Sequence, residues 1–213
     1  MPAPAPAPAA EAVPMPGKVV LATGNPGKVR EIQRILGDLG VEVVPQSELG
    51  VGDADETGAS FVANALIKAR HASLITGLPA IADDSGLVVD ALGGRPGVYS
   101  ARYSGADATD ESNIDKLLRE LEGVPGEQRT AAFHCCAVFV SADDATSLVA
   151  EGRWTGTILE QRRGTEGFGY DPVFFDPECG RTAAELGPEL KNARSHRGKA
   201  LTALAEMLRE HFV

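Results

Sequence analysis

The sequence is poor in cysteine and has no long apolar run. Two of its three cysteines, Cys135 and Cys136, are adjacent and Cys179 stands alone, so the spacing fits neither a disulfide framework nor a zinc site. No apolar stretch approaches the roughly 20 residues that span a bilayer, and the N-terminus lacks the basic start and apolar middle of a secretory signal. We therefore expect a cytoplasmic protein with no membrane partner.

The chain also lacks an excess of positive charge. It carries 20 lysines and arginines against 30 acidic residues, a formal net charge of −10. A nucleic-acid polymer requires basic residues over a wide face, so we expect no such partner. Basic residues do gather in the segment 181–200, which is compatible with a small anion, although a solvated basic face near a C-terminal helix gives the same pattern.

Two common catalytic signatures are missing as well, the Walker A motif and a recognisable set of serine, histidine and acid. In their place, a glycine-containing turn follows an apolar run at 18–22 and precedes a predicted helix. A turn from a strand to a helix N-terminus presents backbone N–H donors to an anion, and the final lysine adds a full charge. A plain glycine turn is the alternative interpretation. The candidate phosphate-binding residues are Thr23, Gly24, Asn25, Pro26, Gly27 and Lys28.

Adjacent acids, Asp83 and Asp84, follow the short apolar run 80–82. We interpret them as the end of a strand, with Gly86 allowing the backbone to turn. Glu56 and Asp84 are the predicted ligands of Mg²⁺, which prefers a few carboxylates and leaves other positions to substrate phosphates. Asp84 is also the predicted base that accepts a proton from attacking water.

The neighbours of Asp84 have less specific predicted roles. We expect Asp83 to cap the turn or to bind a backbone donor. Ser85 is a candidate contact for a phosphate oxygen, and a local turn cap is its alternative role.

Two further segments could contact a nucleoside. An aromatic face at 168–171 could stack on a base, and core or turn packing is the alternative. A cluster of hydrogen-bond donors lies further along the chain, beside Ser195. The candidate substrate-binding residues in the two segments are Phe168, Gly169, Tyr170, Asp171, Lys191, His196 and Arg197.

Hydrophobic periodicity indicates an α/β protein with a mixed sheet. The first 16 residues form an alternating proline and alanine pattern, which favours an extended, disordered tail outside the fold. Residues 17–213 are then a single domain. Helices alternate with strands in its first half, and an antiparallel hairpin follows in the second. The expected strands are 18–22, 41–44, 80–82, 131–140 and 147–151, with 154–159 extending the sheet, and the expected helices are 27–39, 60–75, 109–121 and 195–209.

Six ordered motifs carry a resemblance to a known family. They are T-G-N-P-G-K at 23–28, E-T-G at 56–58, A-D-D-S-G-L at 82–87, G-V-Y-S-A-R-Y at 97–103, F-G-Y-D-P at 168–172 and S-H-R-G-K-A at 195–200. Together they closely resemble the inosine triphosphate pyrophosphatase family, from about Lys18 to the end of the chain. The resemblance implies hydrolysis of non-standard purine nucleoside triphosphates (ITP, dITP and XTP) to the monophosphate and pyrophosphate.

The resemblance further implies a two-lobed α/β fold around a long mixed sheet, an active site in the cleft, dependence on Mg²⁺ and a homodimer. The resemblance places the triphosphate against 23–28, the metal on Glu56 and Asp84, and the proton-accepting role on Asp84. A carboxylate that ligates Mg²⁺ has a lowered basicity, so a water-mediated neighbour of Asp84 is the alternative proton acceptor. Substrate contacts fall on Ser85, 168–171, Lys191, His196 and Arg197. Two alternatives stay open, a noncatalytic nucleotide-binding regulator of the same fold and a pyrophosphatase of modified pyrimidine nucleotides.

Overall fold

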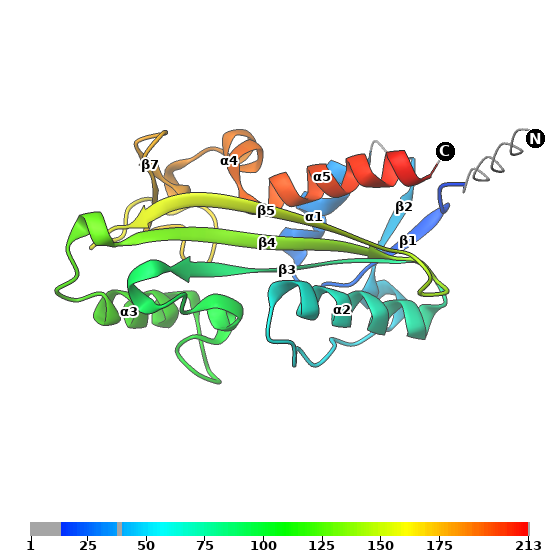
Figure 1. Ribbon diagram of the computed structural model, residues 1–213, viewed down its shortest axis with the longest axis horizontal. Coiled ribbons are helices and arrows are strands. Elements are labelled where there is room, and N and C mark those ends of the chain that lie inside the picture. The colour runs from blue at the N-terminus through cyan, green and yellow to red at the C-terminus, as the bar shows by residue number, and fades with distance from the viewer. Residues whose placement is uncertain (1–13, 38–39, 213) are drawn as a thin grey trace, which may run out of the picture.

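A long mixed β-sheet forms the centre of the computed structural model, which describes residues 14–37 and 40–212 (Figure 1). Within these residues the sheet has seven strands in the order β2-β1-β3-β4-β5-β6-β7. Their bounds are β1 Lys18–Leu21, β2 Glu42–Pro45, β3 Ala80–Val89, β4 Thr130–Val140, β5 Ser147–Ile158, β6 Phe174–Asp176 and β7 Arg181–Thr182.

The sheet is parallel at one end and antiparallel over the rest. Strand β1 pairs in parallel with β2 and β3. The long strands β3, β4 and β5 are antiparallel, with Ala80 opposite Val140 and Val89 opposite Ala131. This arrangement confirms the predicted α/β class with a mixed sheet.

Helices cover both faces of the sheet (Figure 1). Apolar residues of α1 and α5 pack on one face, against Leu21, Ile81 and Phe139. Alanines of α2 pack on the other face, against Val20 and Val138. The α-helices are α1 Pro26–Leu36, α2 Phe61–Thr76, α3 Asp110–Glu120, α4 Pro188–Arg194 and α5 His196–His211, and the 3₁₀ helices are η2 Gln46–Leu49, η3 Asp90–Leu92, η4 Gly97–Arg102, η5 Gly126–Gln128 and η6 Ala183–Glu185.

Side-chain caps start the helices that border the functional site. Asn25 accepts hydrogen bonds from the backbone N–H groups of Gly27 and Lys28, and Ser195 accepts one from Gly198. These caps satisfy donors that have no partner inside the helix. The helix starts therefore agree with the sequence-based expectation to within a residue.

The predicted turn at Gly86 is wrong, because β3 continues through both acids to Val89 and pairs with β4 along its whole length. Gly86 serves a different purpose. A Cβ atom there would collide with the Gly97 carbonyl oxygen and lie 2.6 Å from Ser100 Oγ. Glycine at this position lets η4 approach the strand, which is why a residue with low strand propensity lies inside β3.

Other boundaries also differ. The two expected segments 147–151 and 154–159 form one strand, β5, and α4, β6 and β7 were not predicted from the sequence. Most of the predicted tail and residues 38–39 of the first predicted helix lie outside the described residues. Met15, which we assigned to the tail, packs against the core cluster of α1 and α5. No helix in the described part of the chain has the length and apolarity needed to cross a membrane.

Candidate active site

A pocket of about 710 Å³ brings together segments that are far apart in the sequence. Its walls come from α1 and the loop before it, from the loop at Glu56, from α2, β3, η4 and α3, from the loop at 166–171, and from α4 and the start of α5. The predicted site residues that line it are Asn25, Gly27, Lys28, Glu56, Asp84, Ser85, Phe168, Gly169, Tyr170, Asp171, Lys191, His196 and Arg197.

Thr23 and Gly24 lie beside the pocket and do not line it. The Thr23 hydroxyl accepts a hydrogen bond from the Asn25 N–H at 3.2 Å. A Cβ atom on Gly24 would lie 3.3 Å from Asp53 Oδ1. These two residues thus shape the loop, while Asn25, Gly27 and Lys28 face the pocket. Pro26 is the first residue of α1, where its missing N–H costs nothing.

Asp83 is buried beneath the pocket and holds two cationic side chains in place. Its Oδ2 lies 2.9 Å from Lys28 Nζ and 3.3 Å from Arg197 Nε, and the residue is 1% exposed. Burial raises the pKa of Asp83, but Lys28 and Arg197 outweigh burial and hold this pKa far below its usual range. The expected role as a turn cap is wrong, because the residue lies within a continuous strand and pairs with side chains.

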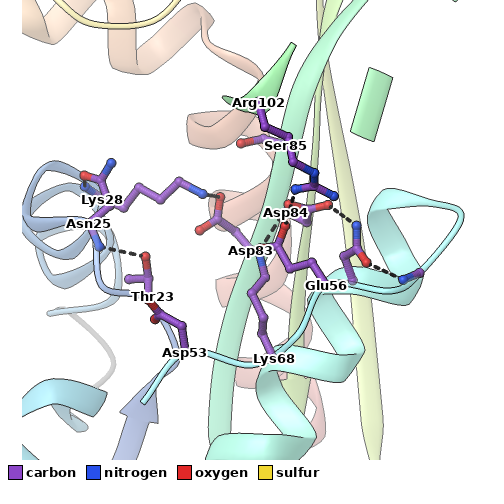
Figure 2. A network of polar contacts seen from close by, with 12 residues as sticks. Thr23, Asn25, Lys28, Asp53, Glu56, Lys68, Asp83, Asp84, Ser85 and Arg102 are labelled. Atoms are coloured by element: carbon purple, nitrogen blue, oxygen red, sulfur yellow. Dashed lines mark hydrogen bonds and ion pairs between the residues drawn. The ribbon is translucent and has the colours of Figure 1, made fainter. Parts of the chain in front are cut away.

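Asp84 and Glu56 meet at one ammonium group (Figure 2). Lys68 Nζ lies 2.9 Å from Glu56 Oε1 and 3.1 Å from Asp84 Oδ1. The Asn64 side chain donates to Asp84 at 3.2 Å and accepts from the Gly58 N–H at 2.8 Å. Asn64 therefore ties the loop that carries Glu56 to the strand that carries Asp84. On the outer side, Arg102 lies 3.5 Å from Glu56.

The electrostatics of the acid pair are unequal. Burial raises the pKa of Asp84, Lys68 opposes this, and the Glu56 charge adds to the rise, so the net shift is upward. Burial also raises the pKa of Glu56, but Lys68 and Arg102 outweigh it and lower the pKa. Asp84 is thus the better proton acceptor of the two, since a raised pKa means a stronger base.

The acid pair fits a divalent cation. Both carboxylates reach a single positive charge, that of Lys68, at hydrogen-bonding distance. No cluster of three or more histidine, cysteine or acidic side chains in the described residues could hold a metal by itself. Two carboxylates with remaining positions left to water and phosphate are the usual surroundings of Mg²⁺. Glu56 and Asp84 would therefore hold the ion together with a phosphorylated ligand.

A second part of the pocket is built around Phe168, a residue that is 48% exposed. Lys191 Nζ lies 5.2 Å and the Arg197 guanidinium 5.6 Å from the ring centroid. Asp171 accepts from the Phe168 N–H at 2.9 Å and pairs with Lys191. Burial raises the pKa of Asp171, and Lys191 only partly opposes this. An exposed aromatic ring beside two cations can stack on a heterocyclic base and contact its polar edge.

Tyr170 and His196 are less exposed than Phe168. Tyr170 is 4% exposed and donates its hydroxyl to the Ser100 carbonyl at 2.8 Å, so core packing describes this residue best. The His196 ring is half-buried and stacks on Phe133 with centroids 4.7 Å apart. Burial and the nearby Arg197 charge lower the pKa of His196 well below its usual value, so its imidazole is neutral at pH 7.

The residues that sequence reasoning missed are Asn64, Lys68 and Arg102. Asn64 and Lys68 are four residues apart on α2, so they share one helix face, and both contact Asp84. Polar residues at this spacing within the otherwise apolar segment 61–68 were the signal that could have found them. Arg102 lies in the G-V-Y-S-A-R-Y motif, to which we assigned no role.

Named proteins are similar to this chain in sequence over most of its length. A dITP/XTP pyrophosphatase of Pectobacterium atrosepticum is 61% identical over 193 residues, which cover 90% of this chain and 98% of that protein. The dITP/XTP pyrophosphatase of Escherichia coli is 58% identical over the same shares of both chains.

Solved structures of related name have a fold similar to that of this chain. A HAM1 protein from Coxiella burnetii matches with a TM-score of 0.85 and 49% identity, over 91% of this chain and 98% of that one. A nucleoside-triphosphatase, dITP/XTP pyrophosphatase, from Mycobacterium abscessus matches with a TM-score of 0.73 and 48% identity, over 90% and 100%. The sequence profile of the Ham1 family matches residues 19–207. This chain therefore belongs to the Ham1 family.

Proposed function

We propose that the protein hydrolyses non-standard purine nucleoside triphosphates, namely ITP, dITP and XTP, to the nucleoside monophosphate and pyrophosphate. The observation that carries this proposal is the convergence of Glu56, Asp84 and Lys68 in the pocket that Lys28 and Phe168 also line. Relatives about 60% identical over 90% of the chain are named dITP/XTP pyrophosphatases, which supports the same substrate class here.

The triphosphate binds at the start of α1 in this proposal. The N–H groups of a helix N-terminus and the Lys28 ammonium favour an anion there. Lys28 is shared with the buried Asp83, which fixes the position of the ammonium while leaving its remaining hydrogens for phosphate oxygens. Ser85 lies on the same wall, where its hydroxyl accepts a hydrogen bond from Arg197 at 3.1 Å and can donate its own hydrogen to phosphate.

Cleavage requires one water molecule and one proton acceptor. The water oxygen forms a bond to the α-phosphorus, the bond from that phosphorus to the α,β-bridging oxygen breaks, and pyrophosphate leaves. Asp84 accepts the water proton, since burial and Glu56 raise its pKa. A divalent ion, Mg²⁺ in this proposal, would be held by Glu56 and Asp84 and would polarise the phosphate oxygens and lower the pKa of bound water.

The base is selected at the end of the pocket around Phe168. Inosine and xanthosine present a 6-keto acceptor where adenosine presents an amino donor. Lys191 and Arg197 can only donate hydrogen bonds, and both lie over the Phe168 ring. An adenine amino group would leave such a donor unpaired, at a cost of about 1 to 3 kcal/mol. The pocket therefore favours a keto base over adenine.

The proposal also includes a homodimer and no nucleic-acid polymer as partner. Leu74 and Ile75 at the end of α2 are 87% and 55% exposed, which supports a covering partner. The net charge of −10 disfavours binding to a polyanion. Light scattering at micromolar concentration would report the mass, and a monomer would contradict this part of the proposal.

Product analysis tests the reaction. The protein is incubated with dITP, ATP and dTTP in the presence of Mg²⁺, and pyrophosphate and phosphate are measured separately. We expect pyrophosphate from dITP in large excess over the other two substrates. Release of single phosphate would contradict the bond assignment, and preference for dTTP would favour a pyrimidine substrate. Binding of dITP without turnover would favour a noncatalytic regulator.

A further inference from the structure

Two arginines of α1 line the pocket and have no partner among the described residues. Arg30 and Arg34 are exposed and belong to the pocket wall. Neither makes an ion pair or a hydrogen bond with any residue that the structure describes. The other basic residues of the wall each pair with a carboxylate: Lys28, Lys68, Arg102, Lys191 and Arg197. Among the described residues, the basic side chains of the wall that lack a carboxylate partner therefore both lie on α1.

The two arginines continue the same helix face as the phosphate-binding turn. Gly27, Arg30 and Arg34 are three and four residues apart, a spacing that places them on one face of a helix. All three line the pocket. At 1.5 Å of rise per residue, Arg34 lies roughly 10 Å beyond Gly27 along the helix axis. An anion that starts at the helix N-terminus and extends outward would meet Arg30 first and Arg34 next.

The arrangement has a cost unless an anion is bound. Like charges four residues apart on a helix destabilise it by a few tenths of a kcal/mol. The chain as a whole carries a net charge of −10. Two neighbouring cations in the pocket wall without a carboxylate partner among the described residues therefore contrast with the charge of the rest of the chain. Guanidinium groups bind phosphate oxygens in a forked, bidentate geometry. A phosphate chain would neutralise both arginines and would match the hydrogen-bonding geometry of their guanidinium groups.

We propose that Arg30 and Arg34 form an outer phosphate subsite, which binds the terminal phosphates of the nucleoside triphosphate and then the departing pyrophosphate. This inference rests on the proposed function. It separates two roles along α1: the turn at Asn25 to Lys28 holds the phosphate nearest the cleaved bond, and the arginines hold the part of the substrate that leaves. A monophosphate product does not reach them.

The test compares two ligands on two double variants. Arg30→Ala/Arg34→Ala removes the subsite, and alanine is compatible with a helix. Arg181→Ala/Arg209→Ala removes the same charge from exposed positions outside the pocket. Affinities for pyrophosphate and for dIMP are measured by calorimetry in the presence of Mg²⁺, at low and at moderate salt.

We expect the subsite variant to bind pyrophosphate about tenfold more weakly than the wild type, as befits two solvent-exposed charge pairs, with dIMP affinity unchanged. Its pyrophosphate affinity should also fall less steeply with salt. Equal pyrophosphate affinity in the subsite variant and the charge control, or an equal loss for dIMP, would overturn the subsite.

Turnover of dITP separates this inference from the function it depends on. A rise in KM in the subsite variant, with KM near the wild-type value in the charge control, supports the subsite. If the wild type releases pyrophosphate from dITP but both double variants keep its KM, the subsite is wrong and the function stands. If the wild type does not turn over dITP, the proposed function fails, while the calorimetric comparison still decides whether the arginines bind pyrophosphate.

Discussion

Asp83 and Asp84 are neighbours in the chain but serve opposite faces of the sheet. Asp83 pairs with Lys28 of α1 and Arg197 of α5, whereas Asp84 contacts Asn64 and Lys68 of α2. Alternation along a strand explains the division, since consecutive side chains point to opposite faces. One strand thus joins the helices of both layers at a single point, and the two acids should respond differently to the same substitution.

Asp84→Asn should abolish most turnover and leave the fold intact. The amide keeps the shape and can still bond to Asn64, but it accepts no proton and is a poor metal ligand. We expect kcat for dITP to fall on the order of a hundredfold or more, with nucleotide binding retained. Kinetics and calorimetry check this, with Asp144→Asn in the exposed hairpin pair to Arg70 as the control. A near-normal rate would remove Asp84 from the chemistry.

Asp83→Asn should instead reduce stability. It leaves Lys28 and the buried Arg197 without their shared carboxylate, and breaking a buried pair costs about 3 kcal/mol. The folded-state pKa of Asp83 is depressed, so its contribution is complete above the unfolded value of about 4 and is lost as pH falls further. Urea unfolding at pH 7 and pH 3 should show the difference from the wild type narrowing at the lower pH. A constant difference would contradict this assignment.

Local signals in the sequence predicted most helices and strands. The side-chain caps at Asn25, Thr109 and Ser195 mark three helix starts, and the alternation from 147 onward marks half of a hairpin. The acid-rich segment of β3 could not be predicted in this way, because Asp-Asp-Ser-Gly has low strand propensity. Its strand conformation depends on pairing with β4 along its whole length.

The candidate site was also predictable only where a local signal in the sequence marks the residue. Charged residues such as Glu56, Asp84 and Lys28 could be chosen as candidates from their residue type and local motif, and the structure brings them to one pocket. The role of Asp83 depends on partners 55 and 114 residues away, which no local pattern contains. Lys68 was missed because it lies in a helix that packs on the core, where a lysine is usually read as a solvent-facing residue.

Gly167→Ala should weaken nucleotide binding. Gly167 has φ +85°, and a Cβ atom there would collide with Asp171 Oδ2 and lie 2.7 Å from Lys191 Nζ. The matched control is Gly169→Ala, which has φ +59° and no atom within 4 Å of an added Cβ. Both substitutions strain the backbone by about 1 kcal/mol, but only the first displaces the Asp171 and Lys191 pair.

We expect KM for dITP to rise about tenfold or more in Gly167→Ala and to change little in Gly169→Ala, because only the first disturbs base contacts. Steady-state kinetics and dIMP calorimetry on both variants make the comparison. Equal effects in the two variants would mean that backbone strain alone matters, and that the Asp171 and Lys191 pair does not position the base.

His196→Phe should flatten the dependence of stability on pH. Burial and the Arg197 charge lower the pKa of His196, with Asp83 opposing, so the folded state holds the ring neutral while the unfolded chain takes up a proton near pH 6.5. The unfolded state then binds more protons, and stability falls as pH drops from 7 through this range. Phenylalanine keeps a ring to stack on Phe133 but does not titrate.

Urea unfolding at pH 7.5 and pH 5 measures the effect. The wild type should lose about 2 kcal/mol more than His196→Phe over this interval, since pH 5 lies about 1.5 units below the unfolded pKa and one unit corresponds to about 1.4 kcal/mol. His71→Gln, which removes a histidine of α2 outside the pocket, serves as the control. If His196→Phe loses as much stability as the wild type, the ring is not held neutral by its surroundings, and a charged imidazole would have to be placed next to Arg197 in the nucleotide site.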